Sequence, residues 1–215
     1  MRGMKTALLI LVVLAVGWIA GAHSAEAVSF DLNVDLCTGG CGSPPFGTVT
    51  LLQNVSTVDV TVHLNSPNWF IKTGAGDSQA FGFNANGVVV GDITVDAHTP
   101  GLVAAAGPFH MDGAGNFGFG INCPSCGNGA PDAFNPDIIF HVANATIADF
   151  VENSSEFAFA ADIFSNNLNG LTGNGNTGVV TTGLAPVPEP SSLLLLGTGL
   201  AAVRVVGQRL KRRAA

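Results

Sequence analysis

Alternating apolar and polar residues recur through the middle of the chain. In residues 28–36 every second residue is apolar, from Val28 to Leu36, and the residues between them are Ser, Asp and Asn. A period of two places the apolar side chains on one face, which predicts a half-buried β-strand. Residues 57–64 repeat the pattern. Together with shorter versions, about nine strands are predicted, at residues 28–36, 47–52, 57–64, 80–83, 88–95, 117–121, 138–142, 157–163 and 179–182.

The segments between these runs have the composition of turns. Residues 65–68, 73–77 and 169–178 are rich in Gly and Asn, which readily adopt the positive φ angles of tight turns. Many short strands with few helix-forming stretches predict an all-β fold, an antiparallel β-sandwich of jelly-roll-like type. The best helix candidate within this region is the short segment 147–152.

The chain begins with a different pattern. Arg2 and Lys5 precede ten apolar residues, 7–16, and small residues follow them. This order is typical of a secretory signal peptide, a helix in residues 1–27 cleaved after Ala27, with cleavage after Ser24 as a second option. An uncleaved anchor is the alternative, although the apolar run is shorter than the roughly 20 residues of a bilayer span. Either interpretation places the domain outside the cytoplasm.

The last 29 residues have three parts in a fixed order. Pro188, Glu189 and Pro190 come first, and an apolar stretch follows. The stretch meets a basic cluster made of Arg204, Arg209, Lys211, Arg212 and Arg213. Prolines keep a junction extended, the apolar stretch enters a bilayer as a helix, and basic residues hold its end on the cytoplasmic side. A helix packed on the domain is disfavoured, because residues 193–196 are apolar on all sides rather than striped.

Residues 187–215 closely resemble the PEP-CTERM sorting signal, with the Pro-Glu-Pro motif, the apolar stretch and the basic end in the order of that family. The resemblance implies that an exosortase, a membrane protease-transpeptidase, cuts at the motif and releases or transfers the protein after transient membrane insertion. It implies secretion to the surface of a Gram-negative-type bacterium, with signal peptidase as the second processing partner. Arg204 departs from the pattern and leaves the apolar stretch short.

Removing both ends leaves one domain, residues 28–186, and changes the charge. The whole chain has a formal charge of −7, but Lys72 is the only Lys or Arg in this domain, against thirteen acidic residues, so its charge is about −12. Such a domain should repel nucleic acid. Calcium could bridge its carboxylates, but residues 112–116 lack the alternating oxygen ligands of an EF-hand loop. A solvated acidic surface is the simpler interpretation, and no cofactor is expected.

Four cysteines form two close pairs, Cys37 with Cys41 and Cys123 with Cys126. Export to an oxidising compartment predicts disulfides, and four cysteines allow three connectivities. We favour bonds within each pair, because Gly and Pro-Ser spacers close tight loops. A redox Cys-x-x-Cys site and a four-thiolate zinc site are the alternatives.

Most aromatic residues are expected in the core. Trp69 follows a turn and is the candidate for stacking on a sugar. The histidines lack metal-binding spacing and are expected at the surface or satisfied in the core. Glu152 and Glu156 are the only glutamates of the domain and the only candidates for a glycosidase pair, and no catalytic motif is present in its required context.

The sequence therefore predicts a non-catalytic cell-surface or extracellular-matrix protein, associated with extracellular polysaccharide. A carbohydrate-binding module with an aromatic sugar site is the alternative.

Overall fold

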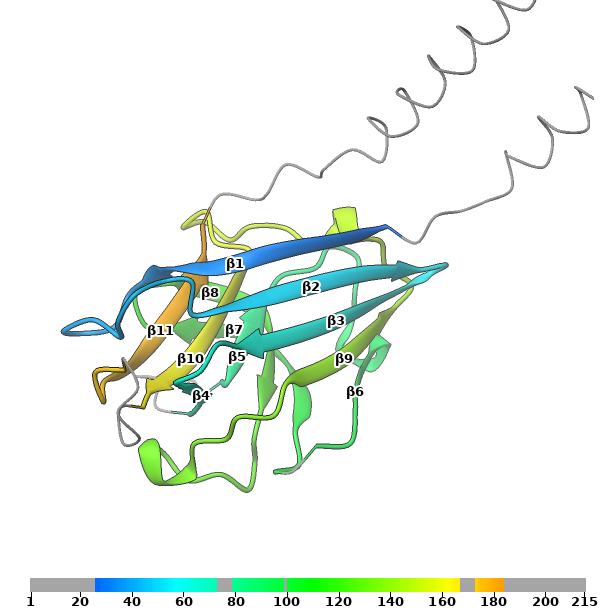
Figure 1. Ribbon diagram of the computed structural model, residues 1–215. Coiled ribbons are helices and arrows are strands. Elements are labelled where there is room, and N and C mark those ends of the chain that lie inside the picture. The colour runs from blue at the N-terminus through cyan, green and yellow to red at the C-terminus, as the bar shows by residue number, and fades with distance from the viewer. Residues whose placement is uncertain (1–25, 73–78, 99, 167–172, 184–215) are drawn as a thin grey trace, which may run out of the picture. The chain divides into compact units, whose positions relative to one another are not determined.

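The computed structural model describes residues 26–72, 79–98, 100–166 and 173–183 (Figure 1). These residues form eleven strands and three short 3-10 helices. The strands are β1 Ala27–Asp35, β2 Gly47–Asn54, β3 Thr57–Leu64, β4 Asn68–Phe70, β5 Phe81–Phe83, β6 Ile93–Val95, β7 Val103–Met111, β8 Gly115–Asn122, β9 Ile138–Ala143, β10 Phe159–Ser165 and β11 Thr177–Thr182. The helices are η1 Val90–Asp92, η2 Ala130–Asp132 and η3 Ile147–Asp149. The helices expected in the signal peptide and in the sorting tail lie outside the described residues.

All strand pairs are antiparallel and belong to one sheet with the order β6-β9-β3-β2-β1-β11-β10-β5-β8-β7, and β4 pairs with β10. The two edge strands, β6 and β7, come close to each other, so the sheet is nearly closed on itself. The all-β, antiparallel prediction is confirmed. The division into two packed sheets of a jelly roll stays a prediction, because the ladder runs without a break from one edge to the other.

Strand β1 joins the two halves of this sheet. Its residues 27–32 pair with β2, whereas residues 32–35 pair with β11. A shift of register between Leu32 and Val34 marks the change of partner, as expected where a β-bulge bends a strand. The alternation predicted for residues 28–36 holds up to this bend: Leu32 is fully buried, while Val34 is only half-buried.

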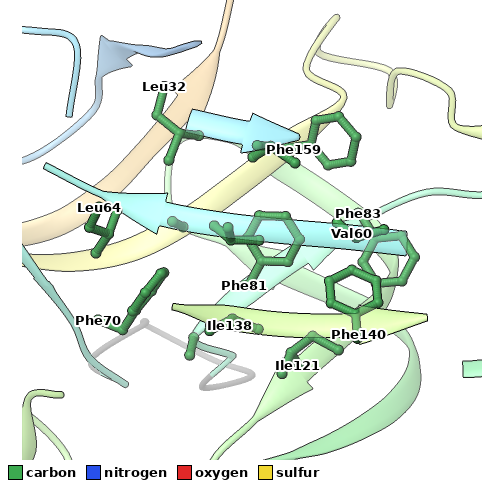
Figure 2. Packing of buried hydrophobic residues seen from close by; sticks show 14 of the residues in the cluster. Leu32, Val60, Leu64, Phe70, Phe81, Phe83, Ile121, Ile138, Phe140 and Phe159 are labelled. Carbon is green, nitrogen blue, oxygen red and sulfur yellow. The ribbon is translucent and has the colours of Figure 1, made fainter. Parts of the chain in front are cut away.

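The main core is rich in phenylalanine (Figure 2). The ring of Phe83 lies 5.0 Å from that of Phe140 and 5.5 Å from that of Phe119, and Phe81 stacks on Phe159 at 6.0 Å. Phe119 and Phe159 come from strands that pair with β5, whereas Phe140 comes from β9, which does not pair with β5 and meets it across the core. Burial of large apolar side chains is the dominant favourable term in folding, so this cluster is where most of the stability resides.

A smaller cluster covers the opposite side of part of the sheet. It consists of Met111, Ala114, Phe117, Ala160 and Val179, with Leu36 and Phe157 packed against it. Six of the seven residues of β10 are buried, which is the pattern of a strand covered on both faces. The sequence predicted a strand at residues 157–163 as a short version of the alternating pattern, whereas the structure buries both faces of it, Asp162 included.

Two strands were not predicted, β4 and β7. Strand β7 contains Ala104 to Gly107 and Pro108, which show no alternation of apolar and polar residues. It is an edge strand with a register shift between Ala106 and Phe109, and an edge is where a strand accommodates proline.

The predicted strand 88–95 was wrong in its first half. Residues 90–92 form η1, because Val89 and Val90 are 63% and 40% exposed and have no buried face to fill. The helix candidate 147–152 is present as the single turn η3.

Candidate functional site

The structure pairs Cys37 with Cys41 and Cys123 with Cys126, the connectivity favoured from the sequence, with Cα–Cα distances of 5.6 and 5.3 Å. All four cysteines lie in the described part of the chain, and none is free there. A zinc site would need four thiolates, whereas these sulfur atoms are bonded to one another. The segment after Cys126 leads into η2, a helix of a single turn.

Asp35 organises the first of these loops. Its two carboxylate oxygens accept hydrogen bonds from the backbone N–H groups of Cys37 and Cys41, at 2.9 and 2.8 Å. The Asn176 side chain donates to the carbonyl of Gly40 at 2.6 Å, which ties the loop to the start of β11. Asp35 lies within 4.8 Å of both sulfur atoms, but since these form a disulfide, the arrangement caps a loop rather than holding a metal.

Trp69 is half-buried at the centre of β4 and stands directly opposite Phe164 of β10, which is also half-buried. Opposite residues of an antiparallel pair lie close on one face of a sheet. Most of the other aromatic residues assigned to the core are buried. Stacking of Trp69 on a sugar stays a prediction.

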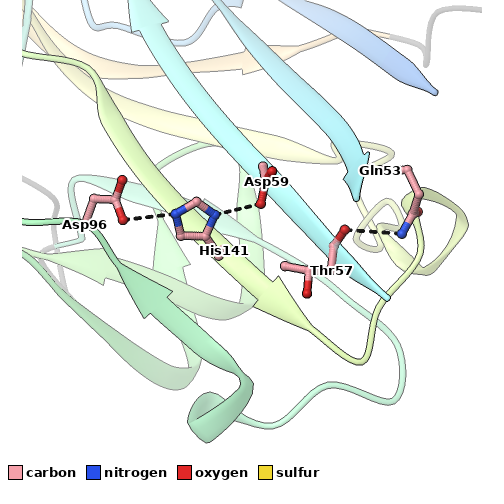
Figure 3. A network of polar contacts seen from close by, with 5 residues as sticks. All are labelled: Gln53, Thr57, Asp59, Asp96 and His141. Atoms are coloured by element: carbon pink, nitrogen blue, oxygen red, sulfur yellow. Dashed lines mark hydrogen bonds and ion pairs between the residues drawn. The ribbon is translucent and has the colours of Figure 1, made fainter. Parts of the chain in front are cut away.

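Polar side chains on the outer face of β3, β9 and β6 form a linked group (Figure 3). His141 of β9 lies between two carboxylates: its Nδ1 is 2.7 Å from Asp59 of β3, and its Nε2 is 3.0 Å from Asp96, just after β6. The Nδ1 of His63 lies 2.8 Å from the carboxylate of Asp137, which forms a second contact between a histidine and an aspartate. We call Asp59, His141 and Asp96 the histidine bridge.

The histidine bridge favours the charged imidazole. A neutral ring can donate from only one nitrogen, but both nitrogens here face carboxylates, which accept hydrogen bonds. The hydrogen bond to Asp59 raises the pKa of His141 above its ordinary value of 6.5; Asp96 adds to the increase, and burial opposes it. No sequence pattern indicated this group, since it depends on the register of β3, β9 and β6.

A polar pocket opens elsewhere on the molecule, with a volume of about 350 Å³. We call it the asparagine pocket. Its walls come from the residues after β5, from β8 and from the segment after η3. They are Asn84, Ala85, Asn86, Asn116, Gly118, Phe119, Val151, Glu152, Asn153 and Ser154. The sequence did not predict this site, because its three parts are separated by about thirty residues at each step.

Hydrogen bonds fix two walls of the pocket. The Oδ1 of Asn84 accepts from the backbone N–H of Gly118 at 2.6 Å. Asn153 donates from Nδ2 to the carbonyl of Ala114 at 2.7 Å, and its Oδ1 accepts from the backbone of Ser155 and Phe157. Two asparagine side chains are thereby held in single orientations.

The segment after η3 is also fastened at its start. The backbone N–H of Val151 donates to the carbonyl of Asn84, and the N–H of Asn86 donates to that of Asp149. The Oε1 of Gln53, near the end of β2, accepts from the N–H of Ile147 at 3.0 Å and so anchors η3 to the sheet. The Nε2 of Gln53 donates to the carbonyl of Thr57, at the start of β3 (Figure 3). The pocket is therefore built on the sheet.

The domain has two glutamates, and both side chains are exposed. Glu152 lies on the wall of the asparagine pocket, and Glu156 lies in the turn that follows, with a φ of 65°. The glycosidase pair considered from the sequence stays a hypothesis for these two side chains.

Among the residues that the structure describes, we find no helix with the length and apolar character needed to cross a membrane. The predicted cleavage motif Pro188, Glu189 and Pro190 and the basic cluster that ends the chain lie outside this part.

Comparison with known families gives one finding, and it concerns the tail. Residues 186–213 match the family model described as the PEP-CTERM protein-sorting motif. The match confirms the resemblance seen in the sequence, and the motif implies an exported cell-surface protein processed by an exosortase. Searches of curated proteins and of solved structures each found no match.

Proposed function

We propose that the domain is a non-catalytic component of the cell surface or extracellular matrix, associated with extracellular polysaccharide. The observation that carries this proposal is the sorting motif at residues 186–213, attached to an acidic, disulfide-paired β domain. A domain of this kind suits an oxidising exterior, because disulfides form and persist there. Each bond stabilises the fold by restricting the unfolded chain. Calcium would bridge its carboxylates to one another or to a matrix.

The non-catalytic part of the proposal is supported by the positions of the ionisable side chains. Glu152 and Glu156 are exposed, and the three members of the histidine bridge hold one another. None of these arrangements pairs a nucleophile with a base and a third orienting group, which is the pattern of covalent catalysis.

Carbohydrate recognition through Trp69 is the second candidate function. It is favoured by the position of Trp69 opposite Phe164, since two partly exposed aromatic side chains on one sheet face offer a surface to a sugar ring. A glycan array tests it: saturable binding that is lost in Trp69→Ala would support this function over a purely structural role.

Replacement of the sorting motif tests the first proposal. With Pro188, Glu189 and Pro190 changed to Ala, exosortase should no longer cut, so full-length protein should accumulate in the membrane fraction and disappear from the released or matrix-bound fraction. Pro131→Ala is the matched control, because it changes an exposed proline of the domain and leaves the motif intact. Unchanged release of the triple variant would contradict the proposal.

A further inference from the structure

The size of the asparagine pocket suits a small ligand. Small-molecule sites occupy roughly 300 to 1,000 Å³, and the pocket, at about 350 Å³, is at the lower end of this range. That volume is in the size class of one or two sugar rings rather than of a large cofactor. It is formed by three segments of one sheet-based scaffold and needs no second chain.

The chemistry of the pocket suits hydroxyl groups. Asparagine amides both donate and accept hydrogen bonds, as hydroxyl groups do, and Glu152 is an acceptor with two oxygens. Asn86, Glu152 and Ser154 are exposed. Asn116 is exposed too, with its Oδ1 3.1 Å from the Nδ1 of His110. Phe119 also lines the pocket, but its ring is buried against Phe83, so the polar side chains provide the contacts.

The charge of the pocket selects against anions. Glu152 is the only charged side chain among the lining residues, and no basic residue is among them. Lys72, the only Lys or Arg of the domain, donates instead to the carbonyl of Cys123 at 3.1 Å. A phosphate or a uronic acid would meet an acidic wall on an acidic domain, so the ligand is expected to be neutral.

The walls are fixed before a ligand arrives. Asn84 is held by Gly118, and Asn153 is held by three hydrogen bonds. Ordering of side chains on binding costs free energy, and walls that are already ordered avoid this cost. The bond of Asn84 uses its Oδ1, so its Nδ2 can donate into the pocket.

We propose that the asparagine pocket binds a neutral sugar unit of a polysaccharide, with Asn84, Asn116 and Glu152 contacting its hydroxyl groups. This inference rests on the proposed association with extracellular polysaccharide and identifies the asparagine pocket as the surface that binds the polysaccharide. It differs from the Trp69 candidate in both position and chemistry, since hydrogen-bonding amides rather than an exposed indole would provide the contacts.

Calorimetric titration tests the proposal on the full-length chain, purified in a detergent without a sugar headgroup and without divalent cations. The probes are the neutral disaccharides cellobiose, lactose and mannobiose, with glucuronic acid as the anionic probe. At least one neutral disaccharide should bind with a 1:1 stoichiometry, and glucuronic acid should bind at least tenfold more weakly. Asn116→Ala and Glu152→Gln should each weaken binding by roughly tenfold, as expected for the loss of a hydrogen bond to a ligand.

Two further variants locate the site. Asn128→Ala removes an exposed asparagine outside the pocket and should bind as the unchanged protein does, and so should Trp69→Ala. Thermal melting of each variant shows that it is folded. Absence of binding by all neutral probes, equal binding of glucuronic acid, or loss of binding in Trp69→Ala but not in the pocket variants would overturn the proposal. The test of the sorting motif measures cell fractions and not sugar binding. A failure of the sugar-binding test therefore leaves the result of the sorting test unaffected.

Discussion

The histidine bridge predicts that part of the stability of the domain is lost as pH rises. Because the pKa of His141 is raised, its contribution is fully present below the ordinary value of about 6.5 and is lost as pH rises through the raised value. Above that range the neutral ring donates to one carboxylate only, and its other nitrogen faces an oxygen lone pair. His141→Gln should therefore be destabilising at pH 6 and nearly neutral at pH 9.

The magnitude follows from the exposure of the three groups. The side chains of His141, Asp59 and Asp96 are 37%, 28% and 48% exposed, so water and salt screen both pairs. Pairs of this kind contribute roughly 0.2 to 1 kcal/mol each, which gives about 1 kcal/mol for the bridge. In a chain of this size, that corresponds to a shift in melting temperature of about 2 to 4 °C.

Thermal melts of the unchanged protein and of His141→Gln, followed by circular dichroism from pH 5.5 to 9, measure the effect. The difference between the two curves cancels the other titrating groups, including His63 with Asp137. The matched control introduces His141→Gln into Asp59→Asn/Asp96→Asn, where no pH-dependent difference should remain. A difference that is independent of pH, or that grows toward pH 9, would refute the reasoning.

Two further predictions concern stability and are measured by urea unfolding. Phe83→Ala should lower the free energy of unfolding by about 3 to 5 kcal/mol, because the ring is fully buried among four other phenylalanines. The control Val103→Ala, at an edge position that is 46% exposed, should change it by less than about 0.5 kcal/mol. Equal effects of the two substitutions would contradict the assignment of the core. Replacement of both Cys37 and Cys41 by Ser should cost roughly 2 kcal/mol, the chain-entropy value for so short a loop, and the cost should vanish when the two proteins are compared under reducing conditions.

The sequence predicted the elements with a strong period of two. Val28, Phe30 and Leu32 alternate with polar residues and are buried as expected, and the same holds for Val58, Val60 and Val62. Strand β7 was missed because it is an edge strand of small and exposed residues, and no hydrophobic pattern distinguishes such a strand from a loop.

The candidate sites could not be predicted in the same way. Asp59 and His141 are brought together by the register of β3 and β9, and Asn84 and Asn116 by the pairing of β5 with β8. Register depends on the packing of whole faces, whereas sequence patterns report one strand at a time. The sorting motif was recognisable because its chemistry is written in consecutive residues.

The pairing of β1 with β11 has a consequence for the order of events during export. The first strand of the domain to emerge from the cell has the last strand as one of its neighbours, so its hydrogen bonds there wait until nearly the whole domain has been translocated. Strand β11 ends at Thr182, and the matched sorting motif begins at residue 186. The last strand and the motif are therefore neighbours in the sequence. Until β11 pairs with β1, one edge of β1 stays unpaired, and an unpaired edge is the part of a sheet that is prone to pair with another chain.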